Sequence, residues 1–230
     1  MATSTTTDSV PELVDGERLD SAEFERRYHA SSIRKAELIE GVVRVASPVT
    51  DDHSPAHGSA TLWVGLYQIG TPHLIMGVEG TVRLDQSNQP QPDVHLRIAP
   101  GFGGGATRSA DGYVEGPPEL IVEVAVTSTR LDLGDKLEAY RRNGVPEYIV
   151  WRVRDRAIDW FRLRDGRYER LVPGDDGLIR SVVFAGLWLD PAALIRGDLP
   201  ALNAAVLAGL ATEEHAAFVA RLAGAQQQQN

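Results

Sequence analysis

The sequence of 230 residues contains no cysteine. This absence excludes disulfide bonds, thiolate metal ligands and cysteine nucleophiles together. No apolar run approaches the roughly 18 residues that a membrane span requires. Residues 1–13 also lack the basic and apolar regions of a secretory signal. We therefore expect a cytoplasmic protein that makes no membrane contact.

Lysine is almost as scarce as cysteine. Of the 23 basic residues, only Lys35 and Lys136 are lysines, and the rest are arginines. A compact ammonium and a planar guanidinium are not interchangeable where a point charge must fit a small space. A lysine on the inward face of a helix in this chain therefore suggests that the ammonium itself is required.

The charge balance is acidic overall but uneven. The net charge of −9 argues against a surface that is generally adapted to nucleic acid. Residues 141–170 are an exception, because they contain nine arginines and five acids. A local basic surface is therefore compatible with the sequence.

Length and composition predict one sizeable globular domain, with 43% hydrophobic and 24% charged residues. We expect a disordered leader over 1–12, the domain over 13–197, and a helical extension with a frayed tail over 198–230. Apolar periodicity predicts both helices and strands, with a β-hairpin meander and a C-terminal helical segment in the second half of the chain. The expected helices are 19–30, 55–69, 132–143 and 191–223. The expected strands are 75–84, 91–98, 120–126 and those of the meander, 147–172, while 36–46 is either a pair of strands or one long strand bent at Gly41.

The strand expected at 120–126 is almost wholly apolar, which is typical of a strand that is buried on both faces. Glu123 lies in its middle, where an isolated carboxylate costs several kcal/mol unless it is paired, protonated or bound to a metal. Lys136 follows in the helix expected at 132–143, on or beside the apolar stripe of that helix. This pairing of a buried acid with an inward lysine is the central feature of the sequence.

Two more acids, Glu37 and Asp93, fall on other expected strands among apolar neighbours. Converging carboxylates suit a hard divalent cation such as Mg²⁺. Together with a lysine, they would suit metal-assisted phosphodiester hydrolysis. A structural ion pair between Glu123 and Lys136 is the simpler alternative. A two-carboxylate glycosidase is also compatible with the spacing, but it gives Lys136 no role.

Two pairs of residues that lie four positions apart allow local predictions. His53 and His57 have the i, i+4 spacing of two metal ligands on one helix, but we expect His53 in a loop and His57 in a packing or capping role. Alternation along 36–46 places Glu40 and Arg44 on one face, where they predict a surface ion pair.

Several segments, taken in order, resemble a known family. They are ELIEG with Glu37, S-P-x-x-x-x-H-x-x-x-H from Ser47 to His57, Gln91-Pro92-Asp93, PELIVEV with Glu123, DLxxKLxxY from Asp132 to Tyr140, and GVPEYIVW. Together they resemble the bacterial restriction-endonuclease-like family of the PD-(D/E)XK nuclease superfamily, from about residue 19 to 189. The resemblance implies an α/β fold with a central mixed β-sheet flanked by helices, and Mg²⁺-dependent cleavage of DNA.

Carried onto this sequence, the resemblance implies that Asp93 and Glu123 are metal ligands, together with the carbonyl group of Val124. The lysine of the superfamily normally follows the second acid by two positions, where this chain has Ala125. Lys136 is therefore interpreted as a migrated catalytic lysine.

The remaining implied roles are subsidiary. Glu37 would be an accessory acid near the metal, and Gln91, Ser128 and Tyr140 would support the ligands. Mn²⁺ could replace Mg²⁺, and cutting both DNA strands suggests a homodimer. The alternative function is a nuclease fold without catalysis that binds DNA or protein.

Overall fold

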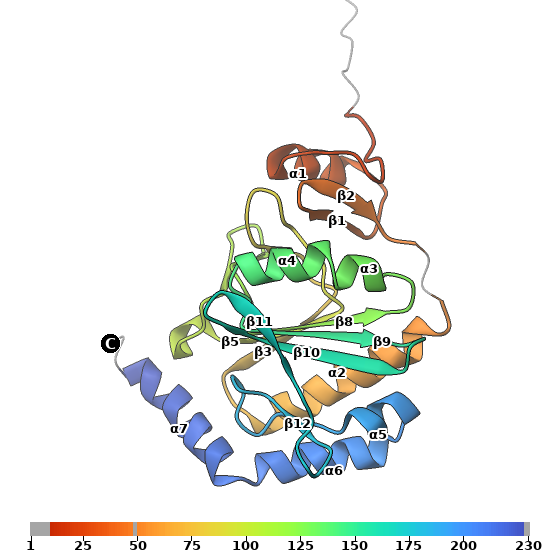
Figure 1. The fold of residues 1–230 in the computed structure, drawn as a ribbon. Coiled ribbons are helices and arrows are strands. Elements are labelled where there is room, and N and C mark those ends of the chain that lie inside the picture. The colour runs from red at the N-terminus through yellow and green to blue at the C-terminus, as the bar shows by residue number, and fades with distance from the viewer. Residues whose placement is uncertain (1–9, 48–49, 228–230) are drawn as a thin grey trace, which may run out of the picture.

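A computed structural model describes residues 10–47 and 50–227. Its centre is a mixed six-stranded sheet (Figure 1). From edge to edge, the strands are β11 (Arg167–Leu171), β10 (Ala157–Arg164), β9 (Glu147–Arg152), β8 (Leu120–Ala125), β5 (Val94–Ile98) and β3 (Leu74–Val78). Neighbouring strands are antiparallel, except that β8 and β9 are parallel. The predicted α/β fold with a central mixed sheet is thereby confirmed.

Helices cover both faces of this sheet, as Figure 1 shows. One face carries α2 (His53–Gly70), α5 (Pro191–Arg196) and α6 (Leu199–Leu210). The other carries α3 (Thr129–Asp132) and α4 (Asp135–Arg142), which form the crossover that two parallel strands need. Trp63 packs edge-on against Trp160 in the first layer, and Tyr140 packs against Tyr148 in the second.

Strand β8 is central, and all six of its residues are buried, as its apolar sequence predicts. Successive side chains of a strand point to opposite faces. Val122 and Val124 belong to the core on the α2 side, whereas Ile121 and Ala125 belong to the core on the α4 side. Glu123 therefore points towards α4, the helix that carries Lys136.

An N-terminal layer lies beyond α4 (Figure 1). It consists of α1 (Ser21–Ala30) and the hairpin of β1 (Ala36–Ile39) and β2 (Val42–Val45). The hairpin turns at Glu40 and Gly41, which both have positive φ, as a tight two-residue turn requires. A β-bridge between Leu38 and Gln89 ties the hairpin to the body of the protein and fixes the residues around β1 near the sheet.

The hairpin also changes which charged residues meet. The predicted ion pair between Glu40 and Arg44 is wrong, because the chain reverses between them. Arg44 lies opposite Glu37 in the register and pairs with Asp135 at 3.3 Å. Glu40 instead pairs with Arg142 at 2.5 Å. An alternation pattern that runs through a turn therefore assigns the faces wrongly.

The helix expected at 132–143 is interrupted at Gly134, which has φ −116° and ψ −104°. A Cβ atom at this position would lie 2.6 Å from the carbonyl oxygen of Arg130, so the backbone path requires glycine. The break ends α3 at Asp132 and places Lys136 in the first turn of α4. The strand expected at 75–84 is also divided, because the chain turns at Glu79 with φ 54°.

The remaining elements are short, apart from the last helix. They are β4 (Val82–Arg83), η1 (Pro100–Phe102), β6 (Thr107–Arg108), β7 (Val114–Glu115), β12 (Ile179–Arg180), β13 (Trp188–Leu189) and α7 (Glu213–Gln227). Residues 1–9 of the expected leader and 228–230 of the expected tail lie outside the described residues. Leu202 and Val206 of α6 belong to the main core, so the expected C-terminal extension is packed onto the domain. Within the described residues, no helix combines the length and apolarity that crossing a membrane requires.

Candidate active site

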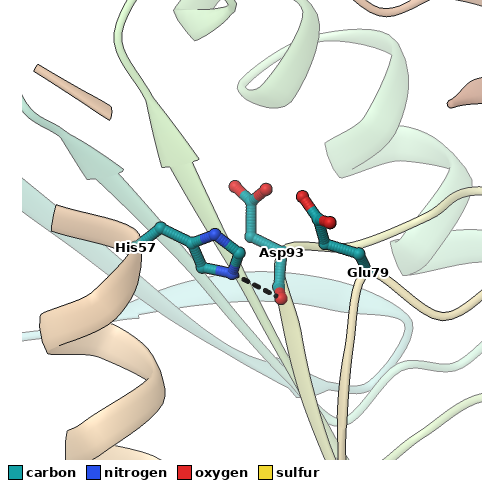
Figure 2. A group of neighbouring side chains, drawn as sticks. All are labelled: His57, Glu79 and Asp93. Atoms are coloured by element: carbon teal, nitrogen blue, oxygen red, sulfur yellow. Dashed lines mark hydrogen bonds between the residues drawn. The ribbon is translucent and has the colours of Figure 1, made fainter. Parts of the chain in front are cut away.

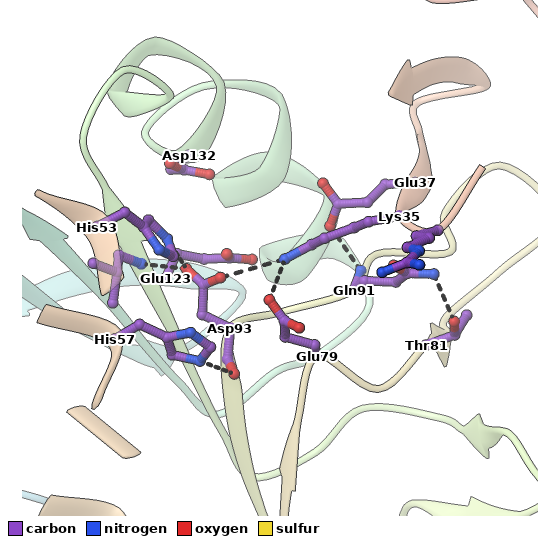
Figure 3. Close-up of polar contacts among 12 residues, drawn as sticks. Lys35, Glu37, His53, His57, Glu79, Thr81, Gln91, Asp93, Glu123 and Asp132 are labelled. Atoms are coloured by element: carbon purple, nitrogen blue, oxygen red, sulfur yellow. Dashed lines mark hydrogen bonds and ion pairs between the residues drawn. The ribbon is translucent and has the colours of Figure 1, made fainter. Parts of the chain in front are cut away.

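A pocket of about 270 Å³ lies between the N-terminal hairpin, the start of α2 and the ends of β8 and α3. It is lined by carboxylates, two ammonium groups and the guanidinium of Arg44. Figure 3 shows several of these carboxylates together with Lys35. The ionisable groups that line it include Glu37, Glu79, Asp93, Glu123, Asp132, Lys35, Lys136 and His53. The structure thus brings the four acids and bases predicted as catalytic into one pocket, although they come from four separate segments.

Asp93 precedes β5 and is only 5% exposed. Its Oδ2 accepts a hydrogen bond of 2.7 Å from the backbone N–H of Val124 and lies 3.5 Å from Nε2 of His53. Its Oδ1 lies 3.4 Å from Nζ of Lys35. Burial alone would raise the pKa of Asp93, but His53, Lys35 and the Val124 N–H outweigh burial and hold this pKa below its usual range. Asp93 is therefore a stable carboxylate at neutral pH.

Glu123 is held from the side of α4. Its Oε1 accepts hydrogen bonds from Lys136 Nζ at 3.0 Å and from the Tyr140 hydroxyl at 2.8 Å. Burial raises the pKa of Glu123, the ammonium of Lys136 opposes that rise, and the charge of Asp93 reinforces it. The pKa remains above its usual range. An additional cation in the pocket would favour the ionised form.

Lys136 is 4% exposed and lies among three carboxylates. Its Nζ is 2.9 Å from Glu37, 3.0 Å from Glu123 and 3.8 Å from Asp132. Burial would lower the pKa of Lys136, but these three acids raise it well above its ordinary value. Burial raises the pKa of Asp132 as it raises that of Glu123, so the ionised form of both acids depends on the nearby ammonium.

The predicted supporting residues contact the cluster in different ways. Gln91 donates its backbone N–H to Oε1 of Glu37 at 2.7 Å. Ser128 donates its hydroxyl to Asp132 at 2.5 Å, and Tyr140 contacts Glu123. Val124 contacts Asp93 through its N–H group. The coordination predicted for the Val124 carbonyl stays a prediction.

Sequence reasoning missed Lys35, Glu79 and Asp132 as members of the pocket. Lys35 had a signal, because it is one of only two lysines in the chain. Asp132 also had one, because it precedes Lys136 by the four residues of one helical turn. Glu79 had none, since its position depends on the turn after β3.

The histidines also lie differently from the prediction. His53 is the first residue of α2, so the expectation that it lies in a loop is wrong. His53 and His57 project from the same helix, with ring centroids 5.5 Å apart. The structure brings His57, Glu79 and Asp93 together, with one potential ligand atom of each lying within 4.8 Å of the others (Figure 2).

The donor set fits a divalent cation. Carboxylate oxygens are the ligands that Mg²⁺ and Mn²⁺ prefer. In the described part of the chain, no hydrogen bond ends on Oε2 of Glu123, whereas Oε1 accepts two. Among the described residues, Oδ1 of Asp93 has a polar contact with the flexible side chain of Lys35, whereas Oδ2 accepts a hydrogen bond from the backbone N–H of Val124. Each acid therefore has one oxygen fixed by the fold and one that can bind a ligand in the pocket.

Comparison with known families identifies the chain. The model of the Uma2 family, described as "Putative restriction endonuclease", matches residues 21–192. The chain belongs to the Uma2 family. The match spans every ionisable group of the pocket, from Lys35 to Lys136. The family resemblance predicted from the motifs is thereby confirmed.

Solved structures and curated proteins give complementary results for this Uma2 chain. A crystal structure described as a putative nuclease belonging to DUF820 from Anabaena variabilis superposes with a TM-score of 0.52 at 13% sequence identity. The superposition covers 74% of this chain and 97% of that chain. At this identity the likeness shows the fold alone. No curated protein matches the sequence.

Proposed function

We propose that this Uma2 protein is a Mg²⁺-dependent endonuclease that hydrolyses phosphodiester bonds in DNA. The observation that carries the proposal is the pairing of Asp93 and Glu123 in one pocket. They come from the segments of two adjacent central strands, and Val94 of β5 lies opposite Val122 of β8. The family and the carboxylate-rich donor set support a metal-dependent nuclease.

Asp93 and Glu123 would hold the ion, with the Val124 carbonyl as a third ligand and Glu37 as an accessory acid. A bound divalent ion would polarise a phosphate oxygen and lower the pKa of a coordinated water. Lys136 supplies the ammonium that position Ala125 lacks. Because it is buried between Glu37 and Glu123, it holds these acids in place and offsets part of their charge.

The test uses purified full-length protein, supercoiled plasmid and linear DNA, with Mg²⁺, Mn²⁺ or EDTA. We expect cleavage with either ion and none with EDTA. Asp93→Asn and Glu123→Gln should each lower the rate by at least about a hundredfold, the scale typical of losing a key electrostatic group. Glu169→Gln is a matched control, because Glu169 is half-exposed on the edge strand β11 and pairs with Arg162.

Absence of cleavage with both ions on every DNA form would overturn the proposal. DNA binding that persists without cleavage would then favour the alternative of a nuclease fold that only binds. Cleavage that survives in EDTA would exclude a metal-dependent mechanism. We also expect a homodimer, since two active sites allow both strands to be cut, and sedimentation of the protein with and without DNA measures this directly.

A further inference from the structure

Lys35 lies at the pocket side of Asp93, immediately before β1. Its Nζ is 3.4 Å from Oδ1 of Asp93 and 3.4 Å from Oε1 of Glu79 (Figure 3). Its side chain is 27% exposed, whereas that of Lys136 is 5% exposed. One lysine is therefore locked inside the acidic cluster, and the other can leave its carboxylates for solvent.

The two oxygens of Asp93 differ in their freedom. Oδ2 is held by the N–H of Val124 at 2.7 Å. Oδ1 contacts Lys35. A cation that approaches Oδ1 from the pocket therefore meets the ammonium of Lys35 already in place. The same is true of Glu79, whose Oε1 also contacts that ammonium.

His57 adds a nitrogen ligand to the same place. Its Nε2 lies 3.0 Å from the backbone carbonyl oxygen of Asp93. A carbonyl oxygen can only accept, so Nε2 carries the proton, and the lone pair of the neutral ring is on Nδ1. In Figure 2, Nδ1 is the ring nitrogen on the side of the Asp93 and Glu79 carboxylates. A carbonyl group that fixes the tautomer of a histidine is a common support for a metal ligand.

We propose that His57, Glu79 and Asp93 form a site for a divalent transition-metal ion, and that the ammonium of Lys35 occupies this site until the ion displaces it. Potential ligand atoms of the three residues lie within 4.8 Å of one another, and an ammonium already bridges the two carboxylates. An imidazole among the ligands favours Mn²⁺, Co²⁺ or Zn²⁺ over Mg²⁺. Asp93 would be shared with the ion of the proposed nuclease, so the inference rests in part on that function.

The first test needs only the wild-type protein, because the chain has just two lysine side chains to follow, Lys35 and Lys136. Peptide-resolved acetylation of the native protein reports the two side-chain amines separately. We expect Mn²⁺ to increase the acetylation rate of Lys35 severalfold, because displacement exposes its amine. Lys136 should stay unreactive with and without Mn²⁺, since it is buried. An unchanged or lowered rate at Lys35, at a Mn²⁺ concentration that saturates binding, would overturn the proposal.

The second test measures metal affinity by calorimetry, without DNA. Lys35→Met should tighten Mn²⁺ binding about two- to fivefold, the effect of removing a partly exposed ion pair that competes with the ion. Arg34→Met is the matched control, because it removes the same charge from the neighbouring exposed residue. Lys35→Arg should not tighten binding. Weaker binding by Lys35→Met would overturn the proposal.

A third measurement separates this site from the nuclease site. His57→Gln should weaken Mn²⁺ binding more than Mg²⁺ binding, because Mg²⁺ gains little from imidazole. Glu79→Gln should weaken Mn²⁺ binding as well. If metal binding depends on Glu123 but on neither Glu79 nor His57, this inference fails and the proposed function stands. If neither ion binds or supports cleavage, both fail.

Discussion

Replacement of Lys136 by methionine tests whether the acidic cluster depends on one ammonium. The substitution keeps an unbranched side chain of similar length but leaves Glu37, Glu123 and Asp132 without their shared cation. Breaking a buried ion pair by removing one partner costs about 3–5 kcal/mol. Domains are stable by about 5–15 kcal/mol, so the variant should remain folded but with little reserve. For a chain of this size we expect a fall of about 10 °C in Tm.

The loss of stability caused by Lys136→Met should increase with pH. Lys136 opposes the rise that burial causes in the pKa of Glu123 and in the pKa of Asp132, so removing its ammonium raises both pKa values further. A carboxyl group whose folded pKa is raised favours the folded state at low pH, and this contribution is lost as pH rises from its unfolded to its folded value. The variant should therefore lose more stability relative to wild type at pH 8 than at pH 5.

Urea denaturation at both pH values, in EDTA, measures these differences. Arg142→Met is the control, because Arg142 lies on the same helix as Lys136 and forms an exposed ion pair with Glu40 of the hairpin turn. Its replacement should cost less than about 1 kcal/mol. Adding Glu123→Gln to Lys136→Met should recover part of the loss, since it removes one uncompensated charge. A Lys136→Met variant within about 1 kcal/mol of wild type at pH 8, or an equal loss at both pH values, would refute the reasoning.

Three further predictions concern stability. Burial raises the pKa of Glu147 from 4.5 to about 7, which corresponds to about 3 kcal/mol of stability lost as pH rises across that range. Glu147→Gln should therefore gain stability relative to wild type between pH 4 and pH 8, and a constant difference would contradict this. Gly77→Ala should lower the free energy of unfolding, measured by urea denaturation, by about 1–3 kcal/mol, because the added Cβ would lie 2.1 Å from the buried ring of His95. An unchanged denaturation midpoint would show that the ring can move aside. Mn²⁺ at a hundred times its Kd should stabilise the wild type by about 2.7 kcal/mol, as measured by differential scanning calorimetry. The Asp93→Asn variant should not be stabilised by Mn²⁺. Wild-type protein that is first stripped with EDTA and then given Mn²⁺ again should recover the full stabilisation.

The parts of the site that lie on regular elements could be predicted from the sequence. The apolar run of β8 fixed the burial of Glu123, and strand alternation fixed the face to which it points. The spacing within 132–143 placed Lys136 on the inward side of its helix even though that helix is broken at Gly134. This prediction holds despite the break, because α4 begins at Asp135 and Lys136 lies in its first turn.

The parts that depend on turns could not be predicted. Glu79 contacts Lys35 because the backbone turns at Glu79, which has a positive φ, directly after β3. Glutamate rarely adopts this conformation, and no sequence motif predicts it here. Arg44 meets Asp135 because a hairpin reverses the chain and packs it against α4. Such contacts depend on where whole segments pack, and local periodicity carries no information about that.

The distribution of lysine connects sequence and site most directly. The chain uses arginine for nearly all its positive charge, yet its two lysines line the same pocket. Around Lys136, acids from β1, β8 and α3 converge on one nitrogen at 2.9, 3.0 and 3.8 Å. A planar guanidinium presents its donors in a fixed fork and cannot direct them to three such positions within the same volume. Around Lys35, a single flexible amine can be released as a unit, whereas the two-pronged contacts of an arginine would resist displacement. The two lysines thus meet opposite requirements, one for a fixed charge and one for an exchangeable charge, and a compact ammonium is the group that can serve both.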